Sequence, residues 1–175
     1  MSRLRTPIGQ HDHVQGPADA PLTLVEYGDF ECSHCGRAHG LLKRLQTQFA
    51  NELRFVYRHF PLTQIHPFAE SAAECSEFAG AHGKFWEMHD ALFENQEQLG
   101  PDLYTELAEE FGLPHAGLRS ALGNHDFLDK IRQDFSSGVR SGVNGTPTFF
   151  INGERFDGAL EELAGALENE LRKAA

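Results

Sequence analysis

Two cysteines separated by two residues, Cys32 and Cys35, are the residues of this sequence that most directly suggest chemistry. They follow an apolar run over residues 22–27 and precede a helical pattern, so Cys32 is expected at a helix N-terminus. The free N–H groups and the dipole of that terminus stabilise a negative charge, and a protonated His34 adds a positive one. Both effects favour the thiolate, which is the reactive form of cysteine. The pair is therefore predicted to exchange disulfides, with Cys32 attacking and Cys35 resolving the mixed disulfide.

Other roles for this motif require features that the sequence lacks. A structural zinc site needs four ligands, and there is no second C-x-x-C; Cys75, His11, His13 or His39 would complete such a site only by an unusual arrangement. Haem attachment requires a histidine directly after the second cysteine, where this sequence has Gly36. A purely structural disulfide fits the position at a helix start less well than a redox pair. A zinc-binding redox sensor is the alternative outside the enzyme class, and metal content after purification distinguishes it.

Cys75 and His39 lie outside the motif. Cys75 falls on the apolar stripe of a later helical pattern, together with Phe68, Ala72 and Ala79. A buried, unreactive thiol is the expected state, with a second redox partner as the alternative. His39 lies four residues after Cys35 on the same helix face. It is expected at the surface, and modulation of the cysteine pair is the alternative.

The composition limits the classes of function. The chain has 175 residues, enough for one domain with a sizeable core, and 40% of them are hydrophobic. It carries 15 lysines and arginines against 26 acidic residues, a net charge of −11, which argues against nucleic-acid binding. No apolar run approaches the roughly 18 residues of a membrane span, so none is predicted.

The N-terminal residues and the cysteine content suggest a location. Residues 1–10 include Arg3 and Arg5 but no apolar segment, so they do not resemble a secretory signal. Three cysteines are too few for a disulfide scaffold and suit an intracellular protein. A cytoplasmic location is expected, or a periplasmic or extracellular one if a leader was removed.

Hydrophobic patterns predict a β-α-β unit near the N-terminus. After a short edge strand at His13-Val14, a central strand is expected over Thr23–Tyr27, a helix from about Ser33 to Phe49, and a strand over Leu53–Phe60. This order implies a parallel pair joined by a right-handed crossover. Residues 1–66 are therefore expected to hold an N-terminal extension and the first βαβ part of the fold.

The remaining chain is predicted to contain a helical insertion and the end of the sheet. Residues 67–141 are predicted to be helical throughout, with Pro67 at a first helical position. Residues 142–175 are predicted to form a ββα part. There Asn152-Gly153 between Thr148–Ile151 and Glu154–Phe156 indicates a two-residue hairpin, and a last helix carries Leu163. The fold class is α/β, in the order β-α-β, helical insertion, β-β-α.

Two motifs together identify a resemblance: Cys32-Ser33-His34-Cys35, and the segment 145–151 in which Pro147 opens a strand. With the helical insertion, they make the chain similar, from about residue 21 to its end, to the DsbA-like branch of the thioredoxin superfamily. The resemblance implies a thioredoxin-like fold and a thiol-disulfide oxidoreductase that acts on protein or peptide substrates. It implies no bound cofactor and no metal, and an unidentified redox partner that regenerates the pair.

The resemblance also implies roles for three further residues. Pro147 is expected to follow a cis peptide bond and to face the cysteine pair, and Thr146 to present its backbone to a bound substrate segment as an added strand. Glu26 stands in an otherwise apolar strand, and an acid there is expected to lie buried beneath the disulfide. Burial would raise its pKa and let it relay a proton to or from Cys35. The alternative is an acid that points to solvent from a half-exposed strand.

The chain departs from the commonest DsbA pattern in ways that bear on the direction of electron flow. Ser33 replaces the usual proline between the cysteines, and Thr146 replaces the valine that usually precedes the cis-proline, as in disulfide isomerases. The dipeptide between the cysteines tunes thiolate stability and hence the redox potential. An oxidase is predicted, and a cytoplasmic disulfide reductase or isomerase is the alternative within the enzyme class.

Overall fold

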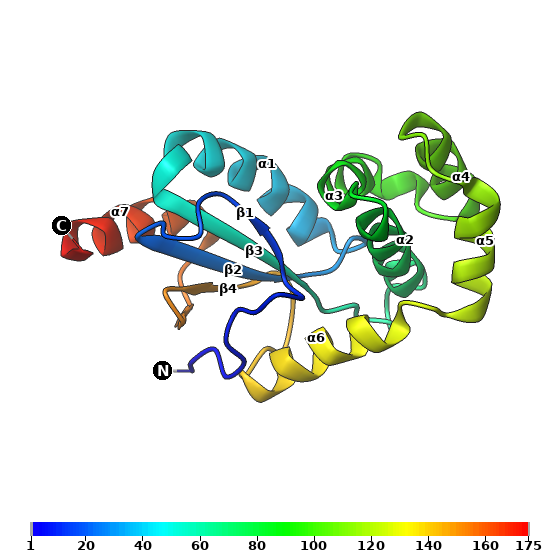
Figure 1. The fold of residues 1–175 in the computed structure, drawn as a ribbon. Helices are drawn as coiled ribbons and strands as arrows, with labels where there is room; N and C mark the ends of the chain where they lie inside the picture. Colours follow the sequence, from blue (N-terminus) through cyan, green and yellow to red (C-terminus); the bar gives the residue numbers. More distant parts are fainter. Residues whose placement is uncertain (1, 175) are drawn as a thin grey trace.

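A mixed five-stranded sheet forms the centre of the molecule (Figure 1), seen in a computed structural model that describes residues 2–174. Its strands are β1 (His13–Gln15), β2 (Leu22–Gly28), β3 (Leu53–His59), β4 (Thr148–Ile151) and β5 (Glu154–Phe156). Their spatial order is β1-β3-β2-β4-β5, with β2 and β3 parallel and the other neighbours antiparallel. The parallel pair is joined through a helix, as such a connection requires.

Within residues 2–174, seven helices pack against the sheet or extend beyond one of its ends. They are α1 (Ser33–Gln48), α2 (Ala69–Ala81), α3 (Phe85–Glu94), α4 (Pro101–Glu110), α5 (His115–Asn124), α6 (Leu128–Arg140) and α7 (Leu163–Ala174). Helices α2–α6 all lie between β3 and β4 in the sequence, and α2–α5 extend beyond one end of the sheet in Figure 1. The predicted α/β fold class and the element order are confirmed.

Two hydrophobic clusters cover the two faces of the sheet. On one face, side chains of α1 and α7 such as Leu42 and Leu167 pack with Leu24 of β2. On the other face, Val25 and its neighbours pack with Phe135 of α6. The two central strands are buried on both faces, and this burial includes the polar residues Glu26, Arg58 and His59. This two-sided burial places α1, and the cysteines at its start, firmly against the end of β2.

The structure corrects the expected start of the first inserted helix. Pro67 was predicted at a first helical position, but α2 begins at Ala69, whose N–H donates to the carbonyl of His66 at 3.3 Å. Phe68 therefore precedes the helix and is 40% exposed, so its predicted place on the inward stripe is wrong. Ala72 and the other members of that stripe are buried as predicted.

The predicted hairpin is present between β4 and β5. Asn152 and Gly153 both have positive φ, 48° and 85°, which a two-residue turn of this hand requires. The Asn152 side-chain oxygen also accepts a hydrogen bond from the Thr23 N–H at 2.8 Å. The turn residue therefore fastens the hairpin to β2 and fixes the position of β4, the strand that follows Pro147.

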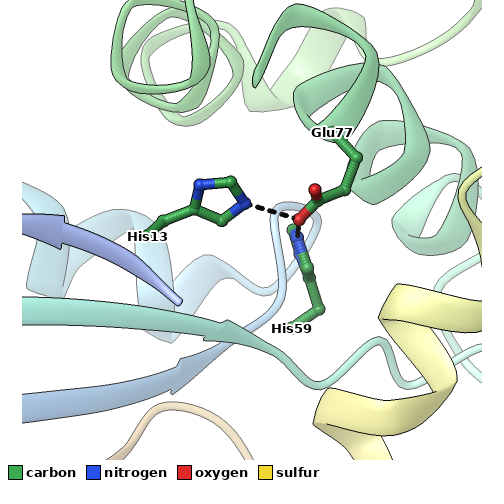
Figure 2. Close-up of side chains that lie close together, drawn as sticks. All are labelled: His13, His59 and Glu77. Atoms are coloured by element: carbon green, nitrogen blue, oxygen red, sulfur yellow. Dashed lines mark hydrogen bonds and ion pairs between the residues drawn. The ribbon is translucent and has the colours of Figure 1, made fainter. Parts of the chain in front are cut away.

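One buried cluster joins the sheet to the helical insertion (Figure 2). His13 of β1 and His59 of β3 each place Nε2 2.7 Å from the same carboxylate oxygen, Oε1 of Glu77 on α2. Burial works against the charge of Glu77, but the two histidine hydrogen bonds outweigh it and hold the pKa of this carboxyl well below its ordinary value. Two histidines and a glutamate are zinc-ligand types. Here, however, the Oε1 atom already accepts from both imidazoles, so the cluster forms a hydrogen-bonded link between the sheet and α2.

Glu77→Gln is expected to lower the free energy of unfolding at pH 7 by about 3 kcal/mol, because it removes the negative charge of the buried oxygen that accepts from both histidines. The folded-state pKa of Glu77 is lowered, so its contribution is fully present above the ordinary glutamate pKa and is lost as pH falls below it. Urea unfolding at pH 7 and at pH 4 measures both effects. Glu87→Gln on the exposed surface of α3 is the control, and an equal loss in both variants would contradict the prediction.

Candidate active site

The two cysteines occupy the places predicted for them. Cys32 is the residue that precedes α1, with an extended backbone (φ −72°, ψ 120°), and Cys35 lies within the first turn. Both are free thiols, so the structure shows the reduced dithiol. Cys32 is 5% exposed and Cys35 is fully buried. Cys32 is therefore the thiol that a partner can approach. Its side chain is nevertheless less exposed than its position at a helix start alone would suggest.

Asp29 organises the loop that leads from β2 to the cysteines. Its carbonyl accepts the Cys32 N–H at 3.1 Å. Its buried carboxylate accepts the Glu31 N–H at 2.8 Å, the Leu62 N–H at 2.9 Å and His66 Nδ1 at 2.7 Å. Burial opposes a charge on His66, but the hydrogen bond to Asp29 raises its pKa overall. The sequence analysis missed Asp29, and its place directly after an apolar strand was the available signal.

Gln96, in the turn after α3, holds the cysteine loop from the side of the helical insertion. Its Nε2 donates to the carbonyls of Phe30 at 2.7 Å and Cys32 at 2.8 Å. Its Oε1 lies where a Cβ at position 36 would be, so only Gly36 leaves room for this contact. The insertion therefore supports the redox motif directly. No local pattern in the sequence marks Gln96 for this role.

The loop before β4 faces the cysteine pair. The Thr146–Pro147 peptide bond is cis, as the resemblance implied. The carbonyl oxygen of Thr146 lies 3.5 Å from Cys32 Sγ and accepts from the thiol. Two segments more than a hundred residues apart in the sequence thus meet at the sulfur atom of Cys32.

The surroundings of Cys32 favour its thiolate. The hydrogen bond from the Cys35 thiol is the largest cause that lowers the pKa of Cys32 to about 5. Burial works in the opposite direction, while the side chain of Thr146 and the backbone N–H groups of Cys35 and His34 lower the pKa further. The N–H groups are those of the helix start, as expected. The thiol of Cys35, rather than the helix end alone, is the main source of the effect.

The surroundings of Cys35 and Glu26 disfavour charge. Burial raises the pKa of Cys35 well above its ordinary value, and the hydrogen bond to Cys32 and the nearby Glu26 carboxyl raise it further. Glu26 is 1% exposed, and neither carboxyl oxygen has a hydrogen-bond partner among the described residues. Burial, together with the negative charge of Cys32, raises the pKa of Glu26 to about 8. Glu26 is therefore buried, as predicted, and does not point to solvent.

The two histidines of α1 differ in their surroundings. His34 is exposed, and its Nδ1 accepts a hydrogen bond from the Arg37 guanidinium, which can only donate. The catalytic role of His34 stays a prediction. His39 was expected at the surface, which is wrong: it is 8% exposed because α3 packs over it, with the Phe93 ring stacked at 5.3 Å. Burial lowers the pKa of His39.

Cys75 is buried, as predicted. It is fully buried on α2, and its thiol lies 3.7 Å from the sulfur of Met88. Burial raises its pKa, so it is expected to remain an unreactive thiol.

Potential metal-ligand clusters lie apart from the cysteines. Within residues 2–174, three groups bring histidine and carboxylate atoms together, and none of them includes Cys32, Cys35 or Cys75. His13 and His39, considered from the sequence as possible completing ligands, belong to two of these separate groups. The geometry therefore gives no support to a zinc site at the C-x-x-C motif.

Titration of the reduced protein is expected to show a thiolate with a midpoint near pH 5, which is the value that its surroundings give Cys32. Cys35→Ala should raise this midpoint more than His34→Ala, because the Cys35 thiol is the largest cause and the His34 contribution comes from its backbone. Absorbance at 240 nm, with the oxidised protein as the blank, measures the midpoint. A larger shift in His34→Ala would show that the imidazole dominates.

Comparison with known proteins gives a family and a set of structural relatives. Residues 9–169 match the family model described as thioredoxin. The structure of BdbD from Bacillus subtilis has a TM-score of 0.87 and 24% identity and covers 98% of both chains. A thioredoxin-like oxidoreductase from Silicibacter pomeroyi has a TM-score of 0.79 and 26% identity and covers 95% of both chains. Wolbachia pipientis alpha-DsbA1 has a TM-score of 0.83 and 21% identity, over 98% of this chain and 96% of that one.

Curated relatives are more similar in sequence but much longer. A protein named Na(+)/H(+) antiporter NhaA 1 from Salinispora arenicola is 46% identical over 94% of this chain and 26% of the relative. One with the same name from Mycobacterium sp. (strain KMS) is 43% identical over 96% of this chain and 28% of the relative. This chain thus spans about a quarter of the length of these relatives. With the family model matched over residues 9–169 and the fold shared with DsbA-type structures, the chain belongs to the thioredoxin family.

Proposed function

We propose that this chain is a DsbA-like thiol-disulfide oxidoreductase that accepts electrons from thiols of protein or peptide substrates. The observation that carries this proposal is the difference in pKa between the two cysteines of the C-x-x-C motif. Cys32 has a pKa lowered to about 5, while the pKa of Cys35, one helical turn away, is raised. A stable Cys32 thiolate favours the reduced pair over the disulfide, which makes the disulfide form an oxidant.

The reaction begins with the Cys32–Cys35 disulfide. A substrate thiolate attacks Cys32 Sγ, a substrate–Cys32 disulfide forms, and Cys35 leaves with the electron pair of the broken bond. Glu26 has a pKa of about 8, so it holds a proton at neutral pH that it can give to the leaving Cys35 sulfur. A second substrate thiolate then attacks the substrate sulfur of the mixed disulfide. Cys32 leaves as a thiolate, and the substrate has lost two electrons.

Thr146 and Pro147 are proposed to hold the substrate segment. The Thr146 carbonyl already lies 3.5 Å from Cys32 Sγ, so a substrate strand that pairs with this backbone would have its cysteine at the reacting sulfur. This chemistry requires no cofactor. It does require a redox partner that restores the disulfide, and that partner is not identified.

The reduction potential, measured against glutathione buffers, tests the direction of electron flow. A value well above the cytosolic glutathione poise of roughly −220 to −260 mV is expected for an oxidase. A value below that range would instead support the reductase or isomerase alternative.

The proposed direction of electron flow also bears on the compartment in which the protein acts. None of the helices within residues 2–174 has the length and apolar character of a membrane span. The cytoplasmic location expected from the sequence stays a prediction. An oxidase needs a compartment in which thiols are not kept reduced, so a high potential would favour the periplasmic or extracellular alternative.

A further inference from the structure

A groove of about 680 Å³ opens beside the reactive cysteine. One wall is a stripe of α1 made of His34, Arg37, Leu41 and Arg44, which recur at the spacing of one helix face. Thr146 and Pro147 also line the groove. Because α1 starts at Cys32 and the Thr146 carbonyl lies 3.5 Å from Cys32 Sγ, a chain lying in the groove leads directly to the reacting sulfur.

The groove carries positive charge on an acidic protein. Arg37 and Arg44 are exposed, and within residues 2–174 neither forms an ion pair with a carboxylate. The Arg37 guanidinium contacts Nδ1 of His34 instead. Glu161 is the acidic residue among those that line the groove. Two arginines beside one glutamate, next to a helix N-terminus, make this region cationic although the chain has a net charge of −11.

The groove also offers an apolar surface between the two arginines. Leu41 lies between Arg37 and Arg44 on the stripe, and Leu160 faces it from the short turn before α7. Both leucines are partly exposed. A partner segment that combines acidic side chains with an apolar one therefore matches the chemistry of the groove.

We propose that this groove selects substrates with acidic residues near the reacting cysteine, which names the substrate class and rests on the proposed oxidoreductase function. Arg37 lies five residues from Cys32, about 7 Å along α1, and Arg44 lies about 10 Å further. An extended segment rises about 3.3 Å per residue. The acidic residues are therefore expected about two and about five residues from the substrate cysteine, with an apolar residue between them.

The step to be measured is reduction of the oxidised protein by peptides that contain one cysteine. Peptide thiolate attacks Cys32 Sγ, and the released Cys35 thiolate is detected by alkylation and mass spectrometry. Three peptides carry Asp, Asn or Lys at the positions two and five residues from the cysteine. Each peptide is made in two orientations, with these residues either before or after the cysteine in the sequence. Acidic neighbours change the reactivity of a thiol. Each rate is therefore divided by the rate of the same peptide with neutral 2-hydroxyethyl disulfide.

In 0.1 M salt, the Asp peptide of one orientation is expected to react about fivefold faster than the Asn peptide of the same orientation, which is a gain that two exposed ion pairs can supply. The corresponding Lys peptide is expected to react more slowly than the Asn peptide. The preference should shrink in 1 M salt. Arg37→Gln/Arg44→Gln should bring the Asp-to-Asn ratio near one, and Arg44→Glu should move the preference toward Lys. The double variant Arg119→Gln/Arg172→Gln, which removes the same charge elsewhere on the surface, should keep the wild-type ratio.

Three results would overturn the inference. Equal reaction of the Asp and Asn peptides in both orientations would remove the selectivity and leave the oxidoreductase function standing. A preference that persists in Arg37→Gln/Arg44→Gln would place its source outside the groove. Reaction with dithiothreitol but with none of the peptides would contradict the proposed function as well.

Discussion

A Cys35→Ser variant is expected to remain covalently joined to its substrates. The mixed disulfide between a substrate and Cys32 is normally short-lived because the Cys35 thiol is within hydrogen-bond reach and resolves it. Serine cannot attack the disulfide, so adducts should accumulate. Non-reducing gel electrophoresis of a cell extract treated with the variant should show bands that collapse when a reductant is added.

Cys32→Ser should abolish both adducts and turnover, because it removes the nucleophile and the more accessible sulfur. Both variants should also carry Cys75→Ala, so that the buried third thiol contributes nothing. Equal trapping by both variants, or trapping only through Cys35, would show that the two roles are reversed. Absence of trapping in either variant, with stoichiometric zinc in the wild type, would favour a metal-binding sensor.

Glu26→Gln is expected to slow the release of Cys35 from its disulfide about a hundredfold at pH 7, which is a typical loss of general-acid catalysis. The physical reason is that Glu26 is the buried carboxyl whose charge interacts with Cys35 and whose pKa of about 8 keeps it protonated near neutrality. Stopped-flow measurement of the reduction of the oxidised protein by a peptide thiol gives the rate. Glu97→Gln, an exposed acid in the turn beside Gln96, should leave the rate unchanged.

The same substitution should change how stability depends on pH. The folded-state pKa of Glu26 is raised from 4.5 to about 8, so the unfolded chain releases this proton first and the folded state loses stability as pH rises between these values. From pH 5 to pH 8 the loss amounts to about 3 kcal/mol of unfolding free energy. The comparison is made between two proteins that both carry Cys32→Ser, so that Cys32 does not titrate. The protein that also carries Glu26→Gln should not show this loss of unfolding free energy. Parallel pH profiles in urea unfolding would contradict the raised pKa.

Local signals in the sequence were sufficient to predict the elements and the redox motif. The C-x-x-C spacing, the apolar run before it and the Asn152-Gly153 turn each reflect interactions between residues close in the chain. The proline at position 147 is also recognisable from its own segment. The division of the chain at residues 67 and 141 into sheet and insertion stays a prediction, although α2–α6 fall between these limits.

Burial of particular side chains was harder to predict because it depends on which helix covers which surface. His39 was expected at the surface although it shares the helix face of Cys35, but α3 packs over it and buries it. Phe68 has the spacing of an inward residue, but the helix starts after it and leaves it exposed. The hydrophobic spacing of a helix depends on that helix alone, whereas the burial of a side chain also depends on the element that packs against it.

By itself, the sequence determined the reactive pair, its position at a helix start and the order of strands and helices around it, since these depend on spacing and local propensity. Only the tertiary structure decided what surrounds the sulfur atoms. It brought the Thr146 carbonyl to Cys32, closed Glu26 off from water, and placed Gln96 against Gly36. These contacts join residues far apart in the chain, and no local pattern encodes them. The pKa values of Cys32 and Cys35 follow from such contacts and from burial, so the reactivity of the motif is set by the whole fold.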